Sequence, residues 1–153
     1  MNFKSVFGAA VAAAVFSLAT PAFAQDAVAV VKERLGIMKM ISDSVKALKA
    51  SADAGKVGAG DAAKAGAALA GAKKALTLFP AGTGADKVKT RAKPEIWKDK
   101  AKFDAGMGKL VAGLTAVEKA AKAGDASAMA SAVKATQASC SGCHKPFRGA
   151  KPE

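Results

Sequence analysis

The 153-residue sequence is poor in the residues on which most protein chemistry depends. It has no tyrosine, one tryptophan, one histidine and two cysteines, and aromatic residues make up 5% of the chain. Two cysteines exclude a disulfide-rich scaffold, and three Cys and His residues together exclude a metal site that needs four such ligands. The question is therefore what one histidine and two cysteines can do.

Acidic residues are also few, because 12 Asp and Glu face 24 Lys and Arg and give a formal net charge of +12. Hydrophobic residues make up 51% of the chain, which excludes a disordered protein. Charged residues make up 24%, which excludes a protein with many membrane spans. The length allows one domain.

Residues 1–24 have the layout of a secretory signal peptide. Lys4 is the only charge, a mostly apolar run follows it, and Ala22-Phe23-Ala24 is a small-x-small cleavage pattern. A retained membrane anchor is the alternative, but the apolar run is short for one. We predict cleavage after Ala24, a mature domain of residues 25–153, and no membrane span in the mature protein.

The mature region shows helical periodicity throughout. Apolar residues recur three or four positions apart, and no segment alternates with the period of two that a strand requires. Helices are expected at 26–50, 61–79, 94–123 and 126–147, with Gly- and Pro-containing breaks between them. The predicted fold class is all-α, and four helices with mostly short connections favour an antiparallel four-helix bundle.

One apolar stripe runs along each predicted helix, and these stripes are expected to form the core. Their members are Val28, Val31, Leu35, Met38, Val45 and Leu48, with Ile37 and Ile41 beside them; Ala65, Leu69, Ala72, Leu76 and Phe79; Ile96, Phe103, Met107, Leu110, Leu114 and Val117; and Met129, Val133, Thr136, Cys140, Cys143 and Phe147.

The run Cys140-Ser141-Gly142-Cys143-His144 is the strongest motif in the chain. Residues three and four apart share one face of a helix, so the two thiols point the same way. The C-x-x-C-H spacing is that of c-type haem attachment. We predict one covalent haem c, with Cys140 and Cys143 bonded to its vinyl groups and His144 as an iron ligand.

Three other uses of the motif are open at this point. A redox dithiol usually opens a helix in a βαβ unit, and no strand is predicted here. A zinc site would lack its fourth ligand. A disulfide between Cys140 and Cys143 would close a four-residue loop and leave His144 unexplained. Haem attachment explains all three residues and adds the large apolar body that an aromatic-poor bundle lacks.

A four-helix bundle with this motif near its C-terminus resembles the class II cytochromes c, the group of cytochrome c′ and cytochrome c-556. The resemblance covers essentially the whole mature chain. Leu78-Phe79-Pro80 resembles the exit of the family's second helix, and Pro94-Glu95-Ile96-Trp97 resembles the start of its third. The resemblance implies a haem near the C-terminal helix, and Arg148 matches a basic residue that the family places beside the haem ligand.

In the family that this chain resembles, the first helix decides what lies on the far side of the iron. The family pattern is Arg-x-x-x followed by Met or an apolar residue, and Arg34 and Met38 fit it. The resemblance thus implies Met38 as the distal iron ligand, with core packing as the alternative. Arg34 is either a contact to a haem propionate or a solvated surface charge. Met40 is a weaker ligand candidate, because it lies about 200° around the helix from Met38.

The function predicted from the sequence is one-electron transfer in the periplasm, not enzymatic catalysis, with low-spin His/Met iron as in cytochrome c-556. The alternative is a high-spin, five-coordinate cytochrome c′ that binds small gases such as nitric oxide. A thiol oxidoreductase is a remote third possibility.

Removal of Lys4 leaves the mature chain with a net charge of +11. That charge is either an ordinary solvated surface or attracts redox partners with an acidic docking surface. The family resemblance allows a homodimer, and no nucleic-acid partner is expected of an exported protein whose lysines are spread along all four helices.

Overall fold

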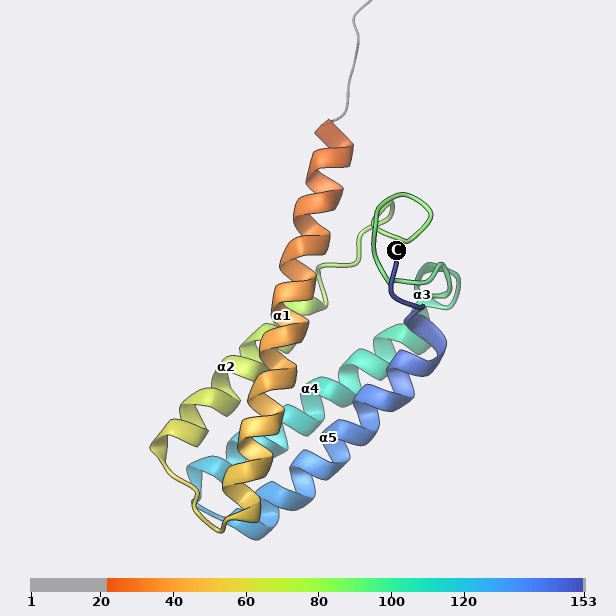
Figure 1. Ribbon diagram of the computed structural model, residues 1–153. Helices are drawn as coiled ribbons and strands as arrows, with labels where there is room; N and C mark the ends of the chain where they lie inside the picture. The colour runs from red at the N-terminus through yellow and green to blue at the C-terminus, as the bar shows by residue number, and fades with distance from the viewer. Residues whose placement is uncertain (1–21, 153) are drawn as a thin grey trace, which may run out of the picture.

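The computed structural model describes residues 22–152, with side chains from Asp26 onward. Its helices are α1 (Ala22–Asp53), α2 (Ala59–Ala75), α3 (Glu95–Lys98), α4 (Lys100–Lys122) and α5 (Ala126–Phe147). The four long helices form an antiparallel bundle, and the short α3 lies at one end of it (Figure 1). Both α1 and α4 pack against α2 and α5. The predicted all-α four-helix bundle is confirmed.

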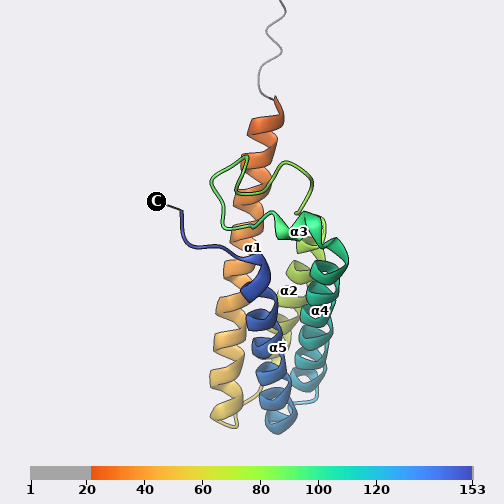
Figure 2. The same cartoon turned by 90° about the vertical axis from the view of Figure 1, so that its right-hand side faces the viewer.

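The predicted signal peptide, residues 1–24, lies outside the described residues except for its last three, which form the start of α1. At this N-terminal end α1 projects beyond the other helices (Figures 1 and 2). Within residues 22–152, no helix has the length and apolar character needed to cross a membrane. Cleavage after Ala24 stays a prediction.

Two predicted helix boundaries are wrong. The second helix ends at Ala75 rather than at residue 79, because Pro80 cannot continue a helix and disfavours helical backbone at Phe79 before it. The predicted helix 94–123 is divided at Asp99, whose backbone leaves the helical region at φ −122° and ψ 57°. The Asp99 carboxylate accepts a hydrogen bond from the backbone N–H of Lys102 at 3.3 Å, so Asp99 begins a new helix as its N-cap.

The last helix begins and ends where the sequence predicts, at residues 126 and 147. Gly124 adopts a φ of 67°, which favours glycine and ends α4. The Asp125 carboxylate then accepts a hydrogen bond from the N–H of Ala128 at 2.9 Å and caps α5. This tight turn sets α5 antiparallel to α4.

The core divides into two apolar clusters along the bundle. The larger runs toward the end that holds the α1–α2 and α4–α5 turns, and its fully buried members include Leu48, Leu114, Val117, Met129 and Val133. The smaller cluster lies near α3 and contains Ala75, Ala92, Ile96, Phe103, Met107 and Phe147. Met107 and Met129 are therefore both core residues.

Three residues of the predicted apolar stripes are exposed, contrary to expectation: Val28 (58%), Leu35 (50%) and Leu76 (43%). Val28 belongs to the first turns of α1, which project beyond the bundle (Figure 1). Leu76 follows the last residue of α2, where the backbone leaves the packed face. Leu35 borders a cavity, so no other helix packs against its exposed side.

Candidate haem-binding site

A cavity of about 800 Å³ lies in the half of the bundle nearest α3, and its size is typical of cofactor sites. It is bordered by α1, α3, α4, α5 and the α2–α3 connection, which comprises residues 76–94. All six residues singled out in the sequence border this one cavity: Arg34, Met38, Cys140, Cys143, His144 and Arg148. The fold therefore brings them together from both ends of the chain.

The C-terminal half of α5 presents the C-x-x-C-H motif to the cavity. Cys140 and Cys143 are half-buried free thiols three residues apart, and His144 follows on the same helix. A side chain placed at Gly142 would meet nothing within 4 Å, so no protein group crowds this part of α5. Two thiols and one imidazole at one cavity wall are the donor set that a c-type haem requires.

The acid–base properties of the thiols argue against a dithiol enzyme. Burial raises the pKa of the Cys140 thiol, and burial followed by the charge of Cys140 raises the pKa of Cys143. A catalytic dithiol needs a lowered pKa, because the thiolate is the nucleophile. The environment here therefore does the opposite of what a thiol oxidoreductase requires.

The environment of His144 keeps its imidazole neutral. Partial desolvation, and then the positive charges of Arg148 and Arg91, lower the pKa of His144. At neutral pH the imidazole therefore retains the nitrogen lone pair that an iron ligand must donate.

α1 supplies the cavity wall that carries Met38. The Met38 side chain is half-buried and packs against the smaller apolar cluster, as does Ile37. Leu35, one turn earlier, also borders the cavity. Apolar and polar residues of α1 therefore both border the cavity near Met38, with Ile41 and Ser42 one turn after it.

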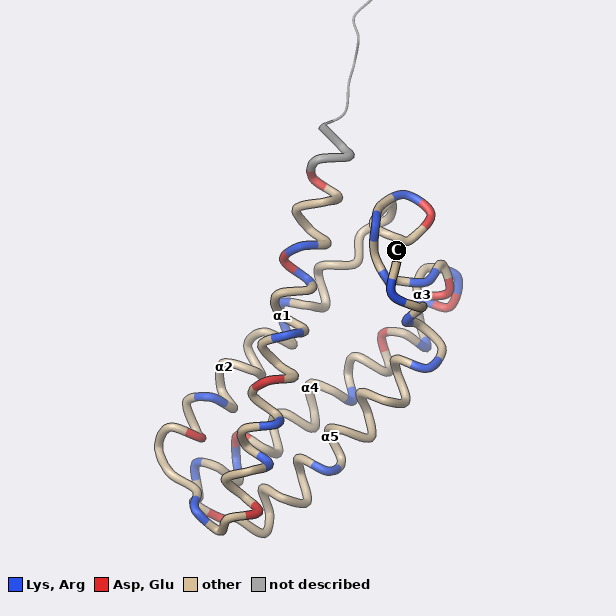
Figure 3. Tube along the Cα trace, in the orientation of Figure 1, with Lys and Arg blue, Asp and Glu red and all other residues tan. Residues whose placement is uncertain are grey.

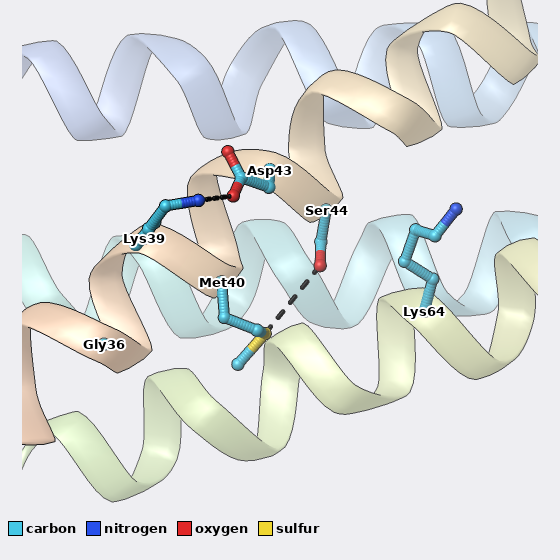
Figure 4. Close-up of a pocket in the computed structure, with 6 residues that line it drawn as sticks. All are labelled: Gly36, Lys39, Met40, Asp43, Ser44 and Lys64. Carbon is cyan, nitrogen blue, oxygen red and sulfur yellow. Dashed lines mark hydrogen bonds and ion pairs between the residues drawn. The ribbon is translucent and has the colours of Figure 1, made fainter.

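Met40 lies in a separate hollow of about 420 Å³ on the α1–α2 side, which is drawn in Figure 4. Its sulfur accepts a hydrogen bond from the Ser44 hydroxyl at 3.8 Å, and its methyl group lies against Gly71 of α2. Met40 does not border the haem cavity. This agrees with the helical-wheel argument that made it a weaker ligand candidate than Met38.

Arg34 is 3% exposed, so its interpretation as a solvated surface charge is wrong. Its Nη1 donates to the Leu78 carbonyl at 3.1 Å and the Thr83 hydroxyl at 3.3 Å. Its Nη2 donates to the Thr83 carbonyl at 3.1 Å and the Thr90 hydroxyl at 3.0 Å. Burial lowers its pKa to about 10, which leaves it charged at neutral pH. The terminal N–H groups thus hold the α2–α3 connection, and the contact of Arg34 to a haem propionate stays a prediction.

An aromatic wall continues from Arg34 across the cavity. The guanidinium carbon of Arg34 lies 4.5 Å from the centre of the Phe79 ring. Phe79 meets Phe103 edge-on with ring centres 4.6 Å apart, and Phe103 meets Phe147 at 5.3 Å in the same manner. All four residues border the cavity, so this wall joins α1, the α2–α3 connection, α4 and α5.

The α2–α3 connection is also joined to the C-terminal segment. Ala92 and Arg148 form an antiparallel bridge. Gly149 donates its N–H to the Arg91 carbonyl at 2.7 Å, and the Arg91 Nε–H donates to the Gly149 carbonyl at 2.8 Å. Partial desolvation and the charge of Arg91 lower the pKa of Arg148. Two guanidinium groups therefore lie near each other beside His144.

α4 approaches α5 closely at two glycines that are seven residues apart. A Cβ at Gly106 would lie 3.1 Å from the sulfur of Cys143. A Cβ at Gly113 would lie 2.6 Å from the hydroxyl of Thr136 and 3.3 Å from its Cα. These distances are shorter than normal van der Waals contacts. Because Gly106 and Gly113 have no side chains, α4 can approach α5 closely and lie against Cys143.

Sequence reasoning missed several cavity residues. Gln137 lies three positions before Cys140 on the same helix face, so helical spacing alone could have identified it. Helical periodicity predicted Leu35 to be a core residue, whereas its side chain is half exposed and borders the cavity. Arg91 gave no signal, since only the bridge to the C-terminal segment brings it to the site.

Comparison with known proteins gives one consistent result. The model of the cytochrome c′ family matches residues 29–148. Cytochrome c′ of Rhodopseudomonas palustris is 35% identical over 126 residues, which are 80% of this chain and 83% of that protein. Cytochrome c′ of Pararhodospirillum photometricum is 36% identical over 121 residues, 78% of this chain and 96% of that protein.

Solved structures show the same likeness. The crystal structure of cytochrome c′ from Rubrivivax gelatinosus has a TM-score of 0.70 and 28% identity, and the match covers 78% of this chain and 94% of that one. With the C-x-x-C-H motif on α5 and the cavity beside it, these matches establish that the chain is a class II cytochrome c of the cytochrome c′ family and binds one covalently attached haem c.

Proposed function

We propose that the haem iron of this protein is five-coordinate and high-spin, with His144 as its only protein ligand, and that the protein binds small neutral gases such as nitric oxide. The relatives that match about four fifths of the chain at 35% and 36% identity are both named cytochrome c′. They favour this function over the low-spin electron carrier that Met38 suggested in the sequence. The protein acts as a haem-binding protein and not as a classical enzyme.

The observation that carries the proposal is the packing of Met38. Its half-buried side chain belongs to the apolar group that contains Phe103 and Met107. A thioether with such contacts is typical of methionine that fills space in a core. Because Met38 also borders the cavity, we assign it the role of a wall residue of that cavity.

The residues that line the cavity bear on which gases the iron would bind. The hydrogen-bond donors, polarity and steric access of the distal side decide which ligands a haem binds. Here α1 contributes Leu35, Met38 and the polar residue Ser42 to the cavity, and the terminal N–H groups of Arg34 are engaged by the α2–α3 connection.

When bound, the haem supplies the iron that takes up the gas and changes oxidation state. The chain's own residues do the rest. Cys140 and Cys143 would hold the porphyrin on α5, His144 would bind the iron, and the aromatic wall would give the porphyrin apolar contacts. Export to the periplasm and pairing into homodimers remain parts of this proposal; N-terminal sequencing and sedimentation of the purified protein test them.

Optical and electron paramagnetic resonance spectra of the purified holoprotein test the proposal. We expect broad high-spin bands in the ferric and ferrous states, and rapid binding of carbon monoxide to the ferrous form. Sharp low-spin bands, with no binding of carbon monoxide, would instead establish the six-coordinate electron carrier with Met38 as a ligand.

A further inference from the structure

Six cations that form no ion pair with a described residue belong to two segments that meet beside the haem cavity. The α2–α3 connection contributes Lys87, Lys89 and Arg91, and the C-terminal end contributes Lys145, Arg148 and Lys151. We call these six residues the basic surface. The bridge between Ala92 and Arg148 holds the two segments together, and Figure 3 shows their Lys and Arg at the end of the bundle that holds α3.

No carboxylate balances this charge within the described part of the chain. The six ion pairs there use Lys39, Lys49, Lys74, Lys93, Lys100 and Lys122, and none uses a member of the basic surface. Asp86 is the one acidic residue in the α2–α3 connection, and residues 144–152 contain none. Lys87, Lys89, Lys145 and Lys151 are exposed. The repulsion among these cations is relieved when an acidic surface approaches.

The position of the basic surface suits electron delivery. Arg91 and Arg148 also border the haem cavity, so a protein seated on the surface would lie against the haem edge. The four lysines lie close to these arginines along the same two segments of the chain, and their side chains are exposed. Complementary charge accelerates such encounters by about 10- to 1,000-fold.

We propose that the basic surface docks a redox protein with an acidic surface, and that this partner reduces the haem. The inference rests on the proposed function, because nitric oxide and carbon monoxide bind the ferrous form most tightly and a donor must regenerate it. One electron leaves the reduced centre of the partner and converts ferric iron to ferrous iron, and no other group is transferred.

The test compares two double variants of the holoprotein with the same change in charge. Lys87→Glu/Lys89→Glu reverses two members of the basic surface. Lys56→Glu/Lys119→Glu reverses two exposed lysines near the opposite end of the bundle, and neither makes an ion pair with a described residue. The probe is a reduced plant-type [2Fe–2S] ferredoxin, an acidic protein of low potential.

We expect the reduction rate of Lys87→Glu/Lys89→Glu to fall at least about tenfold at low salt, and the control to change far less. The difference should vanish near 1 M salt, where the Debye length is about 3 Å. Equal loss in both variants would mean that only net charge matters and would overturn the proposal. An unchanged reduction rate in Lys87→Glu/Lys89→Glu would also overturn the proposal. If this variant keeps its reduction rate but loses binding to anionic phosphatidylglycerol vesicles, the basic surface is a membrane contact.

Two further measurements separate this inference from the proposed function. Lumiflavin semiquinone, a small neutral reductant, should reduce both variants and the parent protein at the same rate, which shows that the iron site is intact. Carbon monoxide binding and the spectrum report on the sixth position alone. A six-coordinate spectrum would refute the gas-binding function. If the rate of reduction by ferredoxin still depended on Lys87 and Lys89, the docking surface would be supported nonetheless.

Discussion

The guanidinium group of Arg34 lies over the ring of Phe79, 4.5 Å from its centre, and is tied to the chain on either side of that ring. Its hydrogen bonds reach Leu78, Thr83 and Thr90, so one side chain of α1 fixes both ends of the segment that closes the haem cavity. Within the described residues no carboxylate pairs with this buried cation. Neutral acceptors and an aromatic face stabilise it instead.

Arg34→Gln should therefore lower the free energy of unfolding by about 3 kcal/mol or more, because it leaves several buried acceptors without donors. Arg34→Lys keeps the charge but lacks the planar fork, so it should not restore stability. Urea unfolding of the holoprotein, followed by circular dichroism, measures both. Lys32→Gln, an exposed change on the same helix, should alter stability by less than about 0.5 kcal/mol. A loss below 1 kcal/mol in Arg34→Gln would contradict the role given to this residue.

Gly113→Ala should lower stability by about 1–3 kcal/mol, since the added methyl group would overlap Thr136 and push α5 from α4. Gly108→Ala is a matched control on the same helix, because a Cβ there meets nothing within 4 Å. That control should raise stability by about 0.5–1 kcal/mol through helix propensity. Thermal unfolding separates the two. Addition of Thr136→Ala should recover part of the Gly113→Ala loss, and no recovery would place the strain elsewhere.

Removal of both thiols should abolish covalent haem attachment. In Cys140→Ala/Cys143→Ala, acidified organic solvent should extract all the haem, whereas each single variant should retain haem through its remaining thioether bond. Loss of the porphyrin should also lower helix content, because burial of its apolar area contributes about 25 cal/mol per Å². Mass spectrometry of the denatured chain gives the result directly. Covalent haem in the double variant would place the attachment at other residues.

Met38→Ala should leave the iron high-spin and increase the association rate of carbon monoxide several-fold, because it removes bulk from the distal wall. Met40→Ala should change neither the spectrum nor the rate, since Met40 lies outside the haem cavity. Flash photolysis and the ferric spectrum measure these effects. Conversion from low spin to high spin in Met38→Ala would identify the sulfur as an iron ligand in the parent protein.

The sequence predicted the helical fold because its signals are local. Gly124 and Asp125 mark the α4–α5 turn through backbone freedom and a side-chain cap, and both act within a few residues. The C-x-x-C-H motif is likewise contained in about one turn of helix, so its chemistry follows from spacing. The Asp99 cap that divides α3 from α4 is equally local. The prediction of one helix over residues 94–123 followed the long apolar periodicity and therefore missed this cap.

Composition and spacing by themselves determined an all-α chain with a haem-attachment motif on its last helix, since helical periodicity and the motif are properties of neighbouring residues. Only the tertiary structure decided that Arg34 is buried, that Leu35 faces a cavity, and that Arg91 lies beside His144. Each of these facts depends on which segment packs opposite, such as the C-terminal segment that binds Arg91 from 58 positions away. Such contacts depend on side-chain fit and on hydrogen bonds between distant segments, which leave no periodic trace in the sequence.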